Sequence, residues 1–136
     1  IRLALYDSSR LTPSQEDSIS EAMTKMNITP LADHDISTLS DGEFQKGCIA
    51  IALAKKSAVI LLDEPTAFLD AENRMIVFQC LRDICDNGPD SPAVIFSTHD
   101  LHEASSVCNK VIALGSDGIL RCDIENIPGT VATIFK

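Results

Sequence analysis

Two adjacent carboxylates follow a short apolar run in the middle of this 136-residue chain. Residues 59–62 are consecutive large apolar side chains, which favours a fully buried strand of a parallel sheet, and Asp63 and Glu64 come directly after them. Ligands of open α/β sheets bind outside the carboxyl ends of the strands. Two acids there could hold a hydrated Mg²⁺ and polarise a water molecule for attack on a phosphate, or they could cap the next helix.

A histidine stands in the equivalent place after a second apolar run. Residues 93–97 predict another buried strand, and His99 follows it after Thr98. Parallel strands end at the same edge of a sheet, so the imidazole could donate a hydrogen bond to a phosphate oxygen near Asp63 and Glu64. A single histidine could also be structural or simply exposed.

A helix start precedes the first strand. Ser40 and Glu43 have the spacing of a capping box, which predicts a helix from there to about Lys56. Gly42 in the first turn lets the backbone approach a ligand, and the unpaired amides of a helix start favour an anion such as phosphate. The segment is therefore a well-capped helix, and capping is compatible with phosphate binding.

The remaining pattern alternates helices with strands. Thr12 and Gln15 form another capping box, before an amphipathic helix that Asn27 ends and whose methionines we expect in the core. Asp70 can cap a further helix, which the Asn-Gly-Pro sequence at 87–89 stops. The other expected elements are a short helix from Leu101, a strand over 110–114 and its hairpin partner over 119–122.

The composition is that of one ordinary domain with an apolar core. The net charge of −9, with scattered basic residues, argues against a nucleic-acid surface. No apolar run approaches the ~20 residues of a membrane span and we see no signal peptide, so we expect a cytosolic protein. The five cysteines lack metal-binding spacing and are expected to be free thiols, with those at 48, 80 and 108 on buried helix faces.

Several segments, in their order and spacing, resemble the motifs of the ATP-binding cassette (ABC) ATPases. They are Leu39 to Glu43 for the signature motif, Gln45 to Ala54 for the helix after it, Val59 to Glu64 for Walker B with its catalytic glutamate, Ala67 to Asp70 for the D-loop, and Ser97 to Asp100 for the switch-histidine loop. The resemblance implies an α/β fold of the P-loop NTPase type. It implies a partial domain with a parallel sheet, flanking helices and a helical subdomain.

The phosphate-binding loop of that family is missing, because no Gly-x-x-x-x-Gly-Lys-Ser/Thr occurs in the sequence. We therefore interpret the chain as the second half of a cassette. Residues 1–56 would form the helical subdomain with the signature helix, and residues 57–136 the C-terminal part of the ATPase core. The strand before the missing loop would lie between those at 93–97 and 110–114. The gap would close by direct pairing, by a second copy, or by leaving apolar edges exposed, and we expect a dimer or poor solubility.

The resemblance also implies ATP and Mg²⁺ as cofactors. Asp63 would hold Mg²⁺ through water, and Glu64 would orient or deprotonate the attacking water. His99 would contact the γ-phosphate. Asp70 would couple the two nucleotide sites of a pair of cassettes.

The signature residues would serve the nucleotide that the opposite cassette holds. Ser40 and the Gly42 amide would touch its γ-phosphate, with Asp41 and Glu43 beside them. These two acids replace a glycine and a glutamine of the usual motif and add negative charge near the phosphate. A capping role for Glu43, turned toward the Ser40 amide, would make its charge tolerable.

Among ABC ATPases, the motif variants are most similar to importers of iron chelates, heme and cobalamin. The resemblance implies an ATP-hydrolysing subunit on the inner face of the cell membrane. Its partners would be a second ATPase subunit, permease subunits and, indirectly, a substrate-binding protein, with no nucleic acid. The alternatives are a non-transport ABC ATPase and a catalytically inert interaction fragment, and we expect this chain alone to be inactive.

Overall fold

The computed structural model describes residues 11–86, 88–89, 91–115 and 118–122. Its backbone forms two compact units, with the boundary between Ser97 and Thr98. The division expected from the family resemblance, at residues 56 and 57, stays a prediction.

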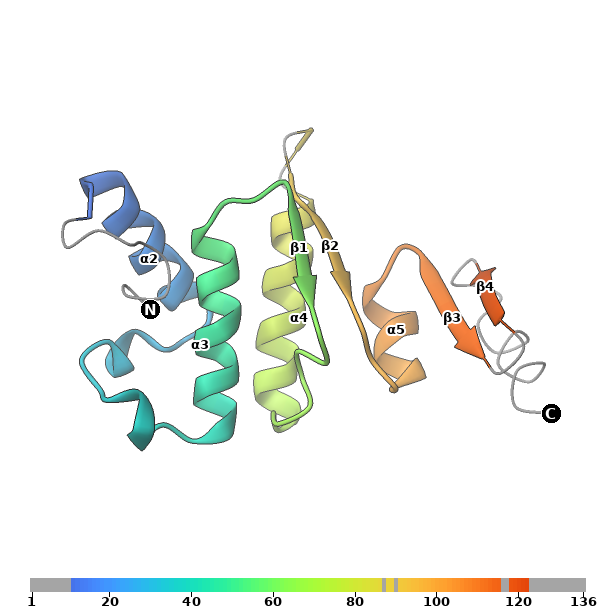
Figure 1. The fold of residues 1–136 in the computed structure, drawn as a ribbon, viewed down its shortest axis with the longest axis horizontal. Helices are drawn as coiled ribbons and strands as arrows, with labels where there is room; N and C mark the ends of the chain where they lie inside the picture. Colours follow the sequence, from blue (N-terminus) through green and yellow to red (C-terminus); the bar gives the residue numbers. More distant parts are fainter. Residues whose placement is uncertain (1–10, 87, 90, 116–117, 123–136) are drawn as a thin grey trace. The chain divides into compact units, whose positions relative to one another are not determined.

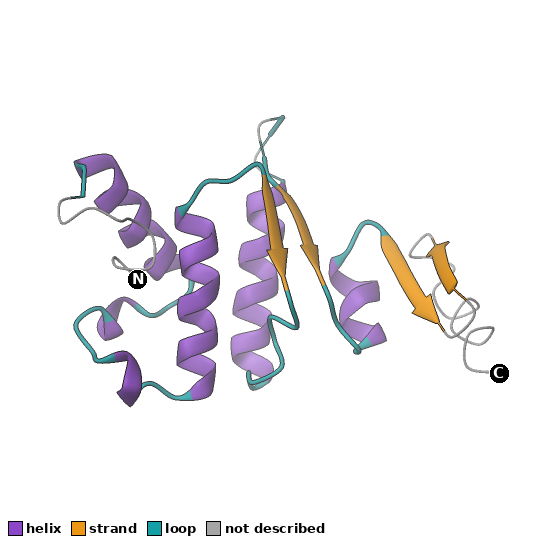
Figure 2. Ribbon diagram, viewed as in Figure 1, coloured by secondary structure: helices purple, strands orange, loops and turns teal. Residues whose placement is uncertain are grey.

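The first unit alternates helices and strands (Figure 1, Figure 2). In chain order its elements are helix α2 (Pro13–Lys25), the 3₁₀ helices η1 (Thr29–Leu31) and η2 (Ile36–Thr38), helix α3 (Asp41–Ala54), strand β1 (Val59–Leu62), helix α4 (Ala71–Cys85) and strand β2 (Ala93–Phe96). The second unit contains helix α5 (Leu101–Val107) and strands β3 (Val111–Gly115) and β4 (Gly118–Cys122). The predicted α/β fold is confirmed.

Strands β1 and β2 pair in parallel, from Val59 opposite Ala93 to Leu62 opposite Phe96. The ladder continues past the strands, because the Ser97 amide donates to the Leu62 carbonyl at 3.0 Å. Helix α4 is the crossover between the two strands, as parallel pairing requires. The residues that follow each strand are therefore held at the same edge of the sheet.

Local sequence signals define the ends of α2. Thr12 and Gln15 form the predicted capping box. At the other end Asn27 takes a left-handed φ of 53°, and the Ile28 amide donates to the Met23 carbonyl at 3.0 Å. This is a Schellman termination, which asparagine tolerates better than most residues because its short polar side chain suits the left-handed region.

The core of the first unit lies among α2, α3 and α4. Met26, Ile49 and Val77, one from each of these helices or its cap, are among the largest fully buried side chains. The prediction that the α2 methionines pack in the core is confirmed, since Met23 is buried as well. Helix α3 lies between α2 and α4 in Figure 1, so it is covered from two sides.

The prediction of a fully buried strand at 59–62 is wrong for one face of the sheet. Ile60 is buried, but Val59 is 51% exposed and Leu61 71% exposed. Helix α4 covers one face, where the Phe78 and Phe96 rings lie 5.6 Å apart. No described residue buries the other face to the same degree. Alternate residues of an extended strand point to opposite faces, so the apolar run is divided between core and solvent.

The second unit contains the predicted hairpin, in which β3 and β4 pair antiparallel from Val111 opposite Cys122 to Gly115 opposite Gly118. Among the described residues β1–β2 and β3–β4 form separate two-stranded sheets. How the gap left by the missing strand closes stays a prediction.

Cys48, Cys80, Cys85 and Cys108 are free thiols. Cys80 is buried and Cys108 half-buried, but the expectation that Cys48 is buried is wrong, because its side chain is exposed. Cys48 lies on the side of α3 away from the row of Lys46, Ile49 and Ala50 that faces the core.

Candidate functional site

A residue from the neighbouring strand orients the first strand-end carboxylate and supports the backbone of the second acid. The Ser97 hydroxyl, just after β2, donates to Asp63 Oδ1 at 2.5 Å. The Ser97 hydroxyl oxygen also accepts a hydrogen bond from the Glu64 backbone amide at 2.9 Å. A hydroxyl-to-carboxylate bond this short is a charge-assisted one. Asp63 and Glu64 are both exposed, so their carboxylates are accessible to a ligand at the sheet edge.

The backbone turns sharply at Glu64. Its φ of 42° lies in the left-handed region, which a residue with a long side chain rarely adopts and which costs on the order of 1 kcal/mol. The chain continues through the buried Pro65 and Thr66, and the Ala67 amide donates to the Glu64 carbonyl at 3.1 Å. Strained backbone of this kind concentrates at functional sites, where it aims a side chain that relaxed geometry would point elsewhere.

The signature-like segment begins α3 with the predicted capping box. The Ser40 amide and hydroxyl both donate to Glu43 Oε2, at 2.9 and 2.8 Å. The Glu43 amide donates in return to the Ser40 hydroxyl at 3.3 Å. These two donors, the amide first, lower the pKa of Glu43. The predicted turn of Glu43 toward the Ser40 amide is confirmed, while Asp41 is exposed in the first turn.

Gly42 lies so close to the loop between β1 and α4 that a side chain at this position would be crowded. A Cβ on this residue would lie 3.1 Å from the Phe68 carbonyl oxygen and 3.3 Å from Leu69 Cδ2. The start of α3 therefore rests against the loop that connects β1 to α4. Gln45, one turn further on, reaches the same loop, because its Nε2 donates to the Glu64 carbonyl at 3.5 Å.

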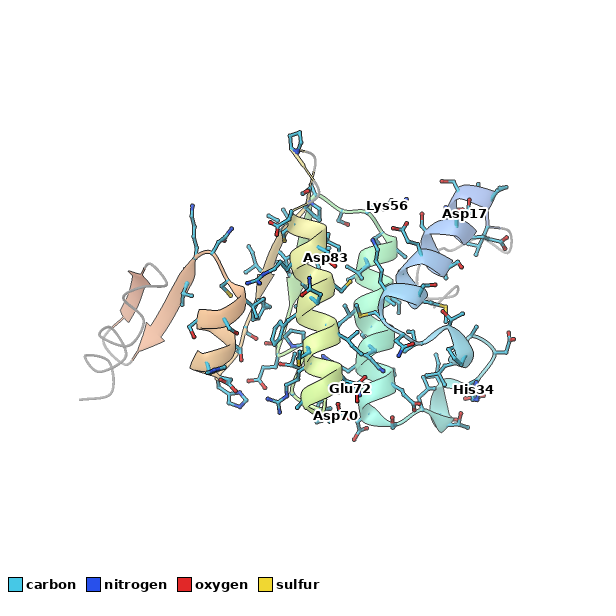
Figure 3. The ribbon with its side chains drawn as sticks, turned by 180° about the vertical axis from the view of Figure 1, so that it is seen from behind. Asp17, His34, Lys56, Asp70, Glu72 and Asp83 are labelled. Carbon is cyan, nitrogen blue, oxygen red and sulfur yellow. The ribbon has the colours of Figure 1, made fainter. Side chains whose placement is uncertain are left out.

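Asp70 caps α4 from the end of this loop. Its Oδ1 accepts from the Asn73 amide at 2.8 Å and from Asn73 Nδ2 at 3.0 Å. The hydrogen bond from the Asn73 backbone amide is the main cause of the lowered pKa of the Asp70 carboxyl. Figure 3 shows Asp70 and Glu72 together at the first turn of α4. The N-cap prediction is confirmed, and the predicted coupling role stays a prediction.

His99 lies in the second unit, after the boundary at Ser97. Its side chain is exposed, and its neighbours form a local turn in which the Asp100 amide donates to Thr98 Oγ1 at 3.0 Å. Asp100 in turn accepts from the His102 amide at 2.9 Å, at the start of α5. The juxtaposition of His99 with Asp63 and Glu64 stays a prediction.

The sequence did not indicate two side chains, Ser97 and Lys46, that form hydrogen bonds between the elements of the site. Ser97 was recognised only as part of a motif, although a polar residue directly after an apolar strand is a signal for the sheet edge. Lys46 Nζ donates to Asn73 Oδ1 at 2.9 Å, which joins α3 to α4. A lysine within a helix carries no local signal for such a contact.

The described residues contain no group of three or more histidine, cysteine or acidic side chains that could hold a metal. None of the described helices has the length and apolar character needed to cross a membrane.

Comparison with known proteins identifies the class that this fold and site define. Residues 3–67 match the family model described as ABC transporter. Over 98% of its length the chain superposes on 54% of a metal-chelate type ABC transporter in an inward-facing conformation, with a TM-score of 0.81 and 27% identity. It also superposes on a bacterial ABC transporter cassette solved as a dimer, with a TM-score of 0.67 and 27% identity over 81% of this chain and 47% of that one. The chain belongs to the ABC transporter ATPases and forms part of their ATPase domain.

Its curated relatives are import ATP-binding proteins. The phosphonates import ATP-binding protein PhnC of Escherichia coli is 38% identical over 106 residues, which are 78% of this chain and 40% of that protein. The cobalamin import ATP-binding protein BtuD of Halobacterium salinarum is 35% identical over 100 residues, 74% of this chain and 24% of that protein. The chain thus spans well under half the length of the curated relatives that it matches.

Proposed function

We propose that this chain supplies the signature, Walker B and switch-histidine part of an ATP-hydrolysing importer subunit. The observation that carries the proposal is the Ser97 hydroxyl bound to Asp63 and to the Glu64 amide across two parallel strands. It holds two exposed acids at the sheet edge where α/β proteins bind ligands. Membership of the ABC transporter ATPases supports ATP as the ligand, and a cassette bound to ADP and phosphate is among its structural neighbours.

The roles follow from the chemistry of each group. Asp63, oriented by Ser97, would hold Mg²⁺ through water, and Mg²⁺ bound there would neutralise charge on the phosphates. Glu64 would take a proton from the attacking water or orient it. His99 would contact the γ-phosphate. Nucleotide chemistry of this kind relies on positioning and charge stabilisation, so small changes in these side chains should have large effects.

The start of α3 would face the nucleotide of a second cassette. Ser40 and the Gly42 amide would contact its γ-phosphate, with Asp41 and Glu43 at the rim and Asp70 coupling the two sites. Glu43 is held by Ser40, which supports a position off the phosphate. The Ser40 hydroxyl donates to Glu43 in this arrangement, so contact with a phosphate requires that hydrogen bond to be exchanged.

The transported solute would belong to the iron-chelate, heme or cobalamin class. The support is the motif variant of this sequence, the cobalamin import relative and the metal-chelate type structural neighbour. The phosphonates import relative is the competing indication. A second ATPase subunit, permease subunits and a substrate-binding protein would be the partners, at the inner face of the membrane.

Titration of this chain with Mg²⁺-ATP, followed by calorimetry, tests the first step. The phosphate-binding loop motif is absent from these residues, so we expect no tight binding and no turnover by the chain alone. Tight binding of Mg²⁺-ATP by the chain would contradict the proposal.

Glu64→Gln in the full-length cassette tests whether Glu64 has a catalytic role. The amide keeps the size of the side chain but cannot accept a proton as a base. We expect ATP binding to persist while most turnover is lost. Glu72→Gln, on an exposed acid in the first turn of α4, is the matched control and should keep normal turnover. Unchanged hydrolysis in Glu64→Gln would contradict the catalytic role proposed for Glu64.

A further inference from the structure

Lys46 is a buried cation in the middle of an otherwise apolar helix surface. Only 7% of the residue is exposed, next to Ile49 and Ala50 on the buried face of α3. Lysine is almost never this buried unless its ammonium is paired, because an ammonium loses its hydration there. Its partner is the neutral amide of Asn73, at 2.9 Å, across 27 positions of sequence.

Asn73 uses each end of its side chain for a different neighbour. Its Oδ1 accepts from Lys46, and its Nδ2 donates to Asp70 Oδ1 at 3.0 Å. The Asn73 backbone amide donates to the same Asp70 oxygen at 2.8 Å. An amide oriented by both partners cannot flip without losing them. Lys46 is thereby connected, through Asn73, to the carboxylate that caps α4.

The charge of Lys46 is felt at both helix starts. It contributes to the lowered pKa of Asp70, after the larger effect of the Asn73 hydrogen bonds. It contributes likewise to the lowered pKa of Glu43, after the hydrogen bonds from Ser40. One buried cation therefore stabilises the ionised caps of α3 and α4, which carry the signature and D-loop segments.

The contacts of Lys46 extend a row along one face of α3. Gly42, Gln45 and Lys46 lie three and four positions apart, which places them on the same face of a helix. Gly42 meets the Phe68 carbonyl, Gln45 reaches the Glu64 carbonyl, and Lys46 reaches Asn73. Gly42 and Gln45 thus lie against the loop from Glu64 to Asp70, and Lys46 joins α3 to the first turn of α4 directly after that loop.

We propose that Lys46 is a positioning residue that, through Asn73 and Asp70, fixes the D-loop segment relative to the signature helix. The inference rests on the proposed function, because the link would matter for turnover only if the two segments serve ATP hydrolysis. Ser40 and Asp70 then move as one body when a second cassette approaches. Lys46 itself touches neither nucleotide nor metal.

The link can be tested on this chain without any nucleotide. Lys46→Met keeps the length and apolar stem of the side chain but removes the ammonium. We expect hydrogen exchange of the Asn73 amide to accelerate about fivefold or more, because Asn73 loses a partner that holds its side chain. Lys46→Arg should restore protection, and Lys55→Met, on an exposed lysine at the end of α3, should change nothing. Wild-type protection of Asn73 in Lys46→Met would overturn the inference.

Asn73→Ala tests the same link from α4, and it does so alone should Lys46→Met fail to fold. It removes the bridge while leaving Lys46 in place, so we expect faster exchange of the Gly42 and Asp70 segments. The double variant, where it folds, should lose less stability than the sum of the single variants. Strict additivity would show that Lys46 and Asn73 act independently and would also overturn the inference.

The purpose of the link is tested in the full-length cassette. Lys46→Met should lower kcat for ATP about fivefold while KM changes less than about twofold, because couplings of this kind are worth on the order of 1 kcal/mol. Lys46→Arg should recover kcat, which a mere loss of folded protein would not explain. Faster hydrogen exchange of the Asn73 amide with unchanged kcat would contradict the positioning role. An inactive wild type would instead refute the proposed function, and the exchange result would still decide whether the link exists.

Discussion

The side-chain hydroxyl of Ser97 donates a 2.5 Å hydrogen bond to the carboxylate of Asp63, across two neighbouring parallel strands. The residues are separated by 34 positions in sequence. The same hydroxyl accepts from the Glu64 amide, so one small side chain orients one acid and supports the backbone of the next. The loop that begins there is fixed at its other end by Asp70 and Asn73.

Replacing Ser97 with alanine should weaken the sheet edge. The change removes a charge-assisted hydrogen bond, so we expect a loss of about 1 kcal/mol or more in the free energy of unfolding. Urea unfolding of the chain measures this loss. Ser57→Ala, in the exposed turn before β1, is the matched control and should stay within about 0.5 kcal/mol of wild type. Equal stability of both variants would show that the Ser97 hydroxyl contributes nothing.

Two glycines of α3 should respond to alanine in opposite directions. A Cβ at Gly47 would meet nothing within 4 Å, so Gly47→Ala should stabilise the chain by up to about 1 kcal/mol through helix propensity. A Cβ at Gly42 would crowd the Phe68 carbonyl at 3.1 Å, so Gly42→Ala should destabilise it. Thermal unfolding of the pair is the measurement. Stabilisation by Gly42→Ala would contradict the close approach of α3 to the loop.

Acid should weaken the capping of α3 and α4. The pKa values of Glu43 and Asp70 lie below their ordinary values of 4.5 and 3.8 in the folded chain. A depressed folded-state pKa contributes stability above the ordinary value, and that stability is lost as pH falls through the folded value. We expect the unfolding midpoint to drop as pH falls below about 4.5 toward 3.

Glu43→Gln tests how much of the loss of stability in acid comes from the Glu43 carboxylate at the start of α3. Glutamine can also complete a capping box, so the variant should be close to wild type at pH 7. Because its amide does not titrate, its stability should fall less steeply in acid. An acid limb as steep as in wild type would show that Glu43 is not a source of the pH dependence.

The cysteines should differ in reactivity. Burial, chiefly, raises the pKa of the Cys80 thiol to about 11, whereas Cys48 and Cys85 are exposed. The thiolate is the reactive form, so at pH 8 we expect an alkylating reagent to modify Cys48 and Cys85 well before Cys80. Peptide mapping by mass spectrometry against time measures the order. Equal rates at all three would contradict the packing of Cys80 against the core.

The uncovered face of the β1–β2 sheet should limit solubility. Val59, Leu61 and Ile95 are each more than half exposed, and together they present apolar surface. Leu61→Thr should raise the concentration at which the chain stays monodisperse, at little cost in stability. Ile60→Ala, one residue away on the covered face, should cost about 2 kcal/mol or more. Light scattering and urea unfolding distinguish the two, and a large stability loss in Leu61→Thr would show that this face is covered.

Much of the site could be predicted because its signals are local. The capping boxes at Ser40 and Thr12 join residues three positions apart, and the Asp70 cap also reaches three positions. The placement of Asp63 and Glu64 at the carboxyl end of a strand follows from the apolar run before them. Parallel pairing with the next strand follows from the intervening helix.

The exposure of Leu61 and Cys48 could not be read from the pattern in the same way. An apolar run at 59–62 is compatible with burial on both faces, and only the arrangement of α4 shows which face is covered. Cys48 lies in a helix that is apolar nearly all round, so its periodicity does not distinguish core from solvent.

By itself the sequence determined the family, the caps and the identity of the strand-end acids, because each depends on residues close together in the chain. Tertiary structure alone decided that Ser97 orients Asp63, that Lys46 reaches Asn73, and that Leu61 is exposed while Ile60 is buried. The first two contacts join residues 34 and 27 positions apart, and their partners meet only when packed elements bring them together. Contacts between residues this far apart in sequence produce no periodic pattern. The sequence of α3 therefore indicated the signature motif but not the contact with Asn73 that joins this helix to α4.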